Sequence, residues 1–137
     1  MGKAIQGFSY GERLPACFAL LGLLKGDLYN LAEKLKIIPL GGLDEIGKNC
    51  TVLEYGKDMI VIDCGVGFPE EDMYGVDLVI PDFSYLVEYQ KNLRGFFITH
   101  GHEDHIGSIP YCLREVNAPI HGTAMTNGLI KLKLEEH

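Results

Sequence analysis

The most restrictive feature of the chain is a run of metal-binding side chains, Thr-His-Gly-His-Glu-Asp-His-Ile-Gly at residues 99–107. Three histidines and one aspartate occupy the six positions from His100 to His105. A packed core has no use for imidazole at this density, whereas a metal site requires it. Residues 94–99 are apolar and β-branched enough for a strand, and residues 106–116 have helical character. We therefore expect a fold in which one strand ends and one helix begins at the ligands, because both are stiff supports.

The ligand spacing predicts two neighbouring cation sites. Side chains two apart in an extended segment point the same way, so His100 and His102 can close on one cation. Asp104 and His105 project together once the chain turns, so they can bind a second cation beside the first. Imidazole with carboxylate favours Zn²⁺, and Mn²⁺ can substitute where carboxylates and water dominate the ligand shell. A helix N-terminus at this point would also help to keep His105 neutral and able to donate its lone pair.

Simpler interpretations exist for the single residues. A lone histidine is usually a satisfied surface or core residue, and Asp104 could serve only as a helix N-cap. His121 and His137, which lie outside the run, are predicted to be ordinary histidines. The pattern H-x-H-x-D-H directly behind a strand nevertheless favours metal binding over these alternatives.

The run resembles the signature of the metallo-β-lactamase superfamily, and the resemblance extends beyond it. Three other segments are similar to the start of the ribonuclease J family, in the RNA-acting β-CASP branch. They are KIIPLGGLDEIGKN at 36–49, VIDCG at 61–65 and FPEEDMYGVDLVIPD at 68–82. The resemblance spans residues 36–137 and implies an α/β fold, the N-terminal and therefore incomplete portion of a metallo-β-lactamase-like αββα sandwich. Residues 1–35 do not match the pattern and are interpreted as an N-terminal extension.

This resemblance implies a zinc-dependent ribonuclease that acts in RNA processing and decay as an endonuclease and 5′→3′ exonuclease. Two Zn²⁺ ions, or Mn²⁺, would activate a water for attack on the phosphodiester. His100 and His102 would hold one ion, and Asp104 and His105, the predicted catalytic residues, the other. RNA is the implied substrate. A second copy or other RNA-decay proteins are the implied partners of the full-length protein, and the cytoplasm is the implied compartment.

Asp63 ends the apolar segment 59–63, where a carboxylate costs stability unless it is paired. It could accept the N–H of a ligating histidine and so fix the tautomer of that ring. It could also be a turn aspartate at a strand end. Because the superfamily has a supporting aspartate at the matching strand end, we favour the first role.

The family site implies three further ligands later in the chain: a histidine, an aspartate that bridges both metals, and a final histidine. No aspartate follows Asp104, and neither His121 nor His137 matches the expected spacing. We therefore expect a truncated piece of a longer enzyme with little or no nuclease activity alone. Two alternatives are another hydrolase of the same fold, of thioesterase or lactonase type, and a non-catalytic metal-binding fragment. The GVDLVIPD segment argues against the former.

Composition agrees with one soluble domain, since 47% of the 137 residues are hydrophobic and 23% are charged. A net charge of −7 argues against a nucleic-acid binder, although bound divalent cations would change the local sign. The sequence has no cluster of lysine and arginine that could form an RNA-binding surface, so most contacts with RNA must come from elsewhere. Four scattered cysteines indicate reduced thiols. The apolar run at 14–24 is too short to span a bilayer, so no membrane association is expected.

Hydrophobic periodicity and turn residues predict the elements between these motifs. Strands are expected at 36–40, 50–55, 59–64, 95–99 and 118–121. Helices are expected at 27–35, 83–92, 105–115 and from 123 to the end. Residues 65–82 form a long loop that is expected to be functional.

Overall fold

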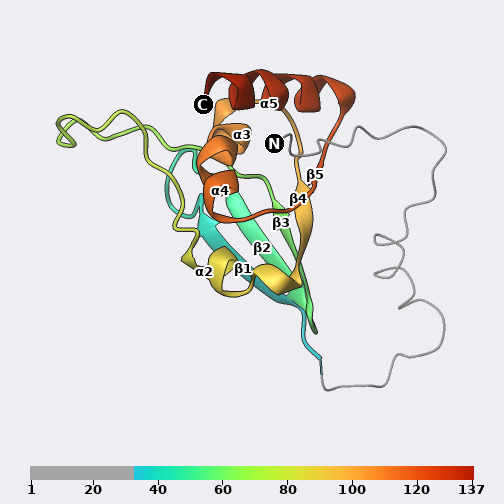
Figure 1. The fold of residues 1–137 in the computed structure, drawn as a ribbon. Coiled ribbons are helices and arrows are strands. Elements are labelled where there is room, and N and C mark those ends of the chain that lie inside the picture. Colours follow the sequence, from blue (N-terminus) through green and yellow to red (C-terminus); the bar gives the residue numbers. More distant parts are fainter. Residues whose placement is uncertain (1–32) are drawn as a thin grey trace.

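A computed structural model describes residues 33–137 and places one five-stranded sheet at their centre (Figure 1). The strands follow one another across the sheet in chain order: β1 Lys36–Gly41, β2 Cys50–Tyr55, β3 Asp58–Ile62, β4 Leu93–Phe97 and β5 Ile120–His121. β1, β2 and β3 are antiparallel neighbours, whereas β4 and β5 run parallel to the strand before them. The hairpin between β2 and β3 turns at Gly56, whose φ of 59° glycine adopts without strain.

Helices fill the connections that parallel strands require. Helix α2 (Ser84–Glu88) and the 3₁₀ turn η2 (Gln90–Asn92) lead into β4, α3 (Glu103–Ile106) and α4 (Ile109–Glu115) connect β4 to β5, and α5 (Ala124–Glu136) follows β5. Thr123 caps α5, because its side chain accepts the backbone N–H of Thr126 at 3.2 Å. Figure 1 shows α3, α4 and α5 stacked together at one side of the sheet. This mixed arrangement confirms the predicted α/β class as a partial fold.

The predicted elements are present with shifted ends. β3 ends at Ile62 because Asp63 adopts a positive φ of 61°, which takes it out of the extended conformation. β4 ends at Phe97 and not at residue 99, and the helix expected at 105–115 is two helices with Pro110 in the first turn of the second. The helix expected at 83–92 is likewise α2 followed by η2.

The remaining differences lie at the two ends. Residues 33–35 form no regular element, and the rest of the helix expected at 27–35 lies outside the described residues. The strand expected at 118–121 is only two residues long.

The core lies between one face of the sheet and the helices. Val52, Met59, Val61 and Phe96 from the strands are 0–1% exposed. They share one apolar cluster with residues from the helices: Leu86, Ile109, Cys112, Leu113 and Ile130. Burying this face supplies the main driving force for the fold.

The opposite face of the sheet is also apolar, and we call it the open face. Its residues alternate with the buried ones and align in register across the strands: Ile37, Leu53, Ile60, Ile62 and Phe97. Ile37 is 65% exposed and the others are partly buried. Sheets that are apolar on both faces are normally covered on both faces. The open face therefore has the composition of a surface inside a larger structure.

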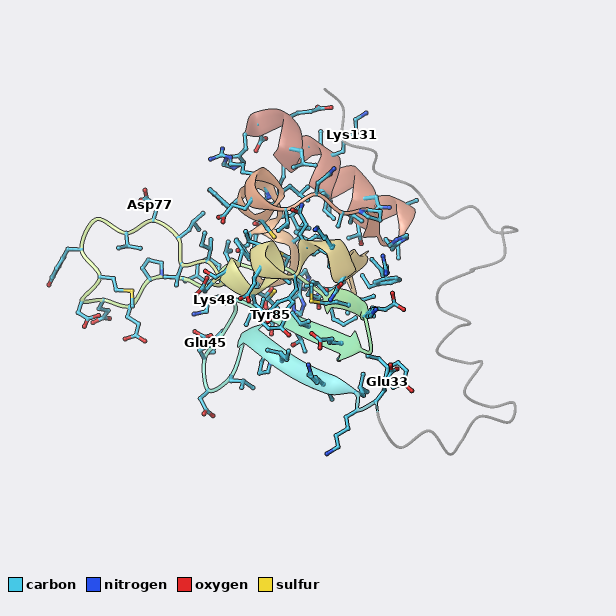
Figure 2. All side chains as sticks on the ribbon, turned by 60° about the horizontal axis from the view of Figure 1, so that its bottom comes forward. Glu33, Glu45, Lys48, Asp77, Tyr85 and Lys131 are labelled. Carbon is cyan, nitrogen blue, oxygen red and sulfur yellow. The ribbon has the colours of Figure 1, made fainter. Side chains whose placement is uncertain are left out.

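A long arm projects from the body, and we define it as residues 68–78. Its base is closed by two backbone hydrogen bonds between Gly67 and Val79, at 2.7 and 3.1 Å. Figures 1 and 2 show the arm extending away from the sheet, with Asp77 between its base and its tip. Among residues 33–137, no helix has the length and hydropathy needed to cross a membrane.

Candidate metal centre

Asp63 lies at the centre of the hydrogen-bond network behind the histidines. It directly follows β3 and is 5% exposed. Its carboxylate accepts the backbone N–H of Thr99 at 2.8 Å, and the Thr99 hydroxyl lies 3.0 and 2.8 Å from its two oxygens. Nδ1 of His105 lies 2.7 Å from its Oδ2. These partners satisfy a carboxylate that burial would otherwise penalise.

The network fixes the tautomer of two histidines. An ionised carboxylate only accepts hydrogen bonds, so Nδ1 of His105 carries the proton that is donated to Asp63. The one hydroxyl proton of Thr99 is directed at Asp63. Thr99 Oγ1 must then accept from Nδ1 of His100, 2.9 Å away. With Nδ1 as the donor in both rings, Nε2 is the nitrogen that is left to bind a metal ion.

The predicted ligands come together where β4 gives way to α3. The ring centroids of His100 and His102 are 4.5 Å apart, and those of His100 and His105 are 4.0 Å apart. Asp104 Oδ2 lies 3.4 Å from Nε2 of His105. Two ligand atoms about 2.1 Å from one tetrahedral ion are about 3.4 Å apart, so this pair has the spacing of a shared Zn²⁺ ligand set.

The donor set, neutral imidazole with carboxylate, fits a divalent transition metal. The arrangement is nevertheless incomplete in the part of the chain that the structure describes. Among residues 33–137, no three histidine, cysteine or acidic side chains converge closely enough to hold an ion. The structure thus brings the predicted ligands into pairs and not into a closed shell.

Backbone hydrogen bonds hold the ligand segment against the end of β3. Cys64 donates its N–H to the carbonyl of His105 at 2.8 Å, and the N–H of Val66 reaches the carbonyl of Glu103 at 3.2 Å. Gly65 lies between them. A Cβ atom at Gly65 would stand 1.6 Å from the Asp104 carbonyl oxygen, so only glycine permits this approach.

Ser108 adds a fully buried contact to the same junction. Its hydroxyl donates to the Gly65 carbonyl at 2.6 Å, and its N–H donates to the carbonyl of Cys64 at 3.0 Å. The segment from Cys64 to Val66 and the start of α4 are therefore joined by both backbone and side-chain hydrogen bonds.

One alternative interpretation of a single residue is wrong. The N-cap of α3 is His102, and Asp104 is the second residue of that helix, so Asp104 is not an N-cap. His105 is the third residue of α3 and so lies in the first turn of a helix, as expected. The hydrogen bond to Asp63 places a proton of His105 on Nδ1.

Three other titratable side chains have surroundings that explain the directions of their pKa shifts. His121 stacks on Phe97 with ring centroids 4.7 Å apart, and burial lowers its pKa. Asp82 accepts the N–H of Ser84 at 2.8 Å at the start of α2, and the hydrogen bonds from Ser84 lower its pKa. Cys64 is a buried free thiol whose pKa is raised well above its ordinary value, first by burial and then by Cys112 and Cys50.

The loop at residues 42–48 carries one compact ion pair. Glu45 accepts the N–H of Gly42 at 2.9 Å and pairs with Lys48 at 3.1 Å, which lowers the pKa of the carboxyl, the backbone contact contributing most. Figure 2 shows Glu45 and Lys48 together near the base of the arm. Lys48 is thus neutralised by its own loop.

Sequence reasoning missed four residues that build the centre: Asn49, Gly65, Thr99 and Ser108. Thr99 directly precedes the histidine run, and this adjacency could have suggested its role. Asn49 lies 55 positions from Asp104, so no sequence pattern could have predicted their contact.

A family model of the metallo-β-lactamase superfamily matches residues 43–130, which include the histidine run and Asp63. The chain belongs to the metallo-β-lactamase superfamily. The supporting aspartate and the ligand run therefore lie within the matched superfamily domain.

Curated relatives narrow the comparison further. The chain is 51% identical over 108 residues to a ribonuclease J of Helicobacter pylori, covering 79% of this chain and 16% of the relative. It is 48% identical over 130 residues to a ribonuclease J of Thermus thermophilus, covering 91% of this chain and 23% of the relative. A Synechocystis ribonuclease J is 49% identical over 105 residues, covering 76% of this chain and 16% of the relative. The chain thus spans less than a quarter of the length of these relatives.

Proposed function

We propose that this chain supplies part of a two-metal ribonuclease site that hydrolyses phosphodiester bonds in RNA. The observation that carries the proposal is the shared carboxylate of Asp63, which orients His105 directly and His100 through Thr99 so that Nε2 of each ring is left for a metal. The printed name of the relatives, ribonuclease J, supports RNA as the substrate.

In this proposal His100 and His102 hold one ion, and Asp104 and His105 hold the other. The ions are Zn²⁺, with Mn²⁺ as a possible substitute. When bound, they supply a water that is deprotonated near neutral pH and positive charge for the phosphate oxygens. Asp63 and Thr99 keep both rings oriented while the imidazole lone pairs are engaged. Asp104 and His105 are the proposed catalytic residues of this chain.

RNA binding requires more than this chain offers. No lysine or arginine occurs between Lys57 and Lys91, whereas the arm carries four acidic residues: Glu70, Glu71, Asp72 and Asp77. Phosphate contacts depend on basic side chains, so the arm is a poor RNA track. We therefore propose that the chain alone has little nuclease activity and that full activity belongs to the longer protein, in the cytoplasm, as a homo-oligomer or with RNA-decay proteins.

The first prediction tests the metal site in the 137-residue chain. Zn²⁺ titration by calorimetry should show binding that is lost in a variant with His100, His102 and His105 all replaced by alanine. His137→Ala is the matched control and should bind as the parent does. Because the site is only partly closed, affinity should be far below the nanomolar range of complete zinc sites. Binding that survives the triple substitution would overturn the assignment of these ligands.

The substrate class needs a separate assay. The chain should hydrolyse 5′-monophosphorylated RNA slowly with Zn²⁺ or Mn²⁺, and the triple variant should not hydrolyse it. Faster hydrolysis of a thioester or a lactone than of RNA would favour the other hydrolase class of this fold.

A further inference from the structure

Asn49 contacts both members of the proposed Asp104–His105 ligand pair. Its side-chain nitrogen lies 3.1 Å from the Asp104 carbonyl oxygen, 3.2 Å from Asp104 Oδ2 and 3.3 Å from Nε2 of His105. The nitrogen therefore faces the two atoms that would bind the second ion and the backbone between them.

The number of donors and acceptors at Asn49 does not match in this arrangement. The amide has two N–H groups, yet three acceptors surround it. All three contacts lie within hydrogen-bond distance, so two N–H groups are shared among three acceptors. If a cation takes the Nε2 lone pair, two N–H groups remain for two oxygens, and every group is satisfied.

We propose that Asn49 is a positioning residue that holds Asp104 and His105 as a ligand pair and yields its contact with Nε2 when a cation binds. The inference rests on the proposed metal site and adds a residue to it. Asn49 itself is not a ligand in this scheme, because it faces the pair with its amide nitrogen, whose lone pair is delocalised into the carbonyl group.

The backbone of Asn49 already performs the structural task at this position. Its N–H donates to the Asp104 carbonyl at 3.1 Å, and its carbonyl accepts from Gly65 at 2.9 Å. A side-chain substitution leaves both bonds in place. The side-chain amide can therefore be removed without separating the loop from α3, which makes the proposal testable by mutation.

The experiment compares Asn49→Ala with Ser108→Ala in the 137-residue chain. Ser108 supports the same junction through the Gly65 carbonyl but touches neither proposed ligand side chain. Competition between each variant and a zinc chelator gives Zn²⁺ affinity, and thermal unfolding without metal gives stability. We expect Asn49→Ala to weaken Zn²⁺ binding about tenfold, the lower end for residues that orient ligands. Ser108→Ala should change affinity less than about twofold while lowering the unfolding temperature.

A spectroscopic measurement follows the amide itself. In the parent chain, the two side-chain N–H signals of Asn49 should shift on addition of Zn²⁺ and remain unshifted in the His105→Ala variant. Equal Zn²⁺ affinity in Asn49→Ala and parent, or an affinity loss that tracks stability in both variants, would overturn the positioning role. If the parent chain itself fails to bind Zn²⁺, the proposed metal site fails. If Zn²⁺ binds but the side-chain signals of Asn49 do not shift, only the inference about Asn49 is wrong.

Discussion

At the scale of single residues, the centre depends on how a few protons are shared. Asp63 is a buried carboxylate that contacts the ligand run, and Thr99 extends its influence to His100 through a hydroxyl. Because Thr99 also binds Asp63 through its backbone N–H, the loop stays in place whatever its side chain is. The hydroxyl therefore has a role that can be separated from the fold.

Replacing Thr99 by valine tests this role. Valine keeps the shape but cannot accept the Nδ1 proton of His100, so the ring loses the partner that fixes its tautomer. We expect Thr99→Val to weaken Zn²⁺ binding about tenfold, in the range typical of groups that orient a ligand. Thr99→Ser retains the hydroxyl and should bind nearly as the parent chain does. Competition with a zinc chelator measures the Zn²⁺ affinity of both variants. Equal affinity of Thr99→Val and Thr99→Ser would contradict the role of the Thr99 hydroxyl between Asp63 and His100.

At the scale of elements, one buried acid connects two strands and a helix. Glu54 on β2 pairs with Lys36 on β1 and accepts the hydroxyl of Tyr85 on α2 at 2.6 Å. The contacts with Lys36 and then Tyr85 lower the pKa of Glu54, and the bond to Glu54 raises the pKa of Tyr85 to about 12. Figure 2 shows Tyr85 projecting from α2 over the sheet.

The pH dependence of unfolding should report this cluster. A depressed carboxyl pKa contributes stability that is complete above the ordinary value of 4.5 and is lost as pH falls through the folded value. A raised tyrosine pKa contributes stability that is complete below 10 and is lost as pH rises towards about 12. We plot the free energy of unfolding in urea against pH. Relative to the parent, Glu54→Gln should reduce the loss of stability at both acid and alkaline pH, whereas Tyr85→Phe should reduce mainly the alkaline loss. Parallel profiles for parent and Glu54→Gln would refute the assignment.

A substitution at Gly65 tests how closely the ligand segment packs against the end of β3. A Cβ atom at Gly65 would overlap the Asp104 carbonyl, so Gly65→Ala must displace α3. We expect a loss of about 3 kcal/mol in the free energy of unfolding, the upper end for overpacking. Gly128→Ala is the control, because nothing lies within 4 Å of its added Cβ on α5. This change should instead stabilise the chain by about 0.5–1 kcal/mol. Urea unfolding measures both, and a neutral Gly65→Ala would argue against the close approach.

The sequence predicted this level of structure well because its signals are local. The apolar segment 59–63 predicted β3, and the strand before His100 predicted the position of the ligands. Element ends were displaced where long-range contacts decide them. Asp63 ends β3 through a conformation that its partners Thr99 and His105 stabilise, 36 and 42 residues away. Such partners leave no periodic trace in the sequence.

At the scale of the whole molecule, the two faces of the sheet differ in how far they are buried. One face is sealed by helices, while the open face presents apolar side chains that only partly pack, with Ile37 65% exposed at the edge strand β1. Within residues 33–137, β1 is an edge strand of the sheet, and a strand edge beside apolar surface promotes association between chains. The relatives are more than four times as long as the region they share with this chain, since it covers 16–23% of their length.

The open face leads to the last prediction, which concerns the chain in solution. Sedimentation velocity should show self-association that rises with concentration, because burying the open face removes apolar area from water. Ile37→Lys places a charge at the exposed edge and should raise the dissociation constant about tenfold, equivalent to about 1.4 kcal/mol. Leu132→Lys is the matched control on α5, where Leu132 is 58% exposed on another surface. It should leave association unchanged. If Leu132→Lys, and not Ile37→Lys, abolished association, the contact would lie on α5 and the open face would not be the surface that joins the chains.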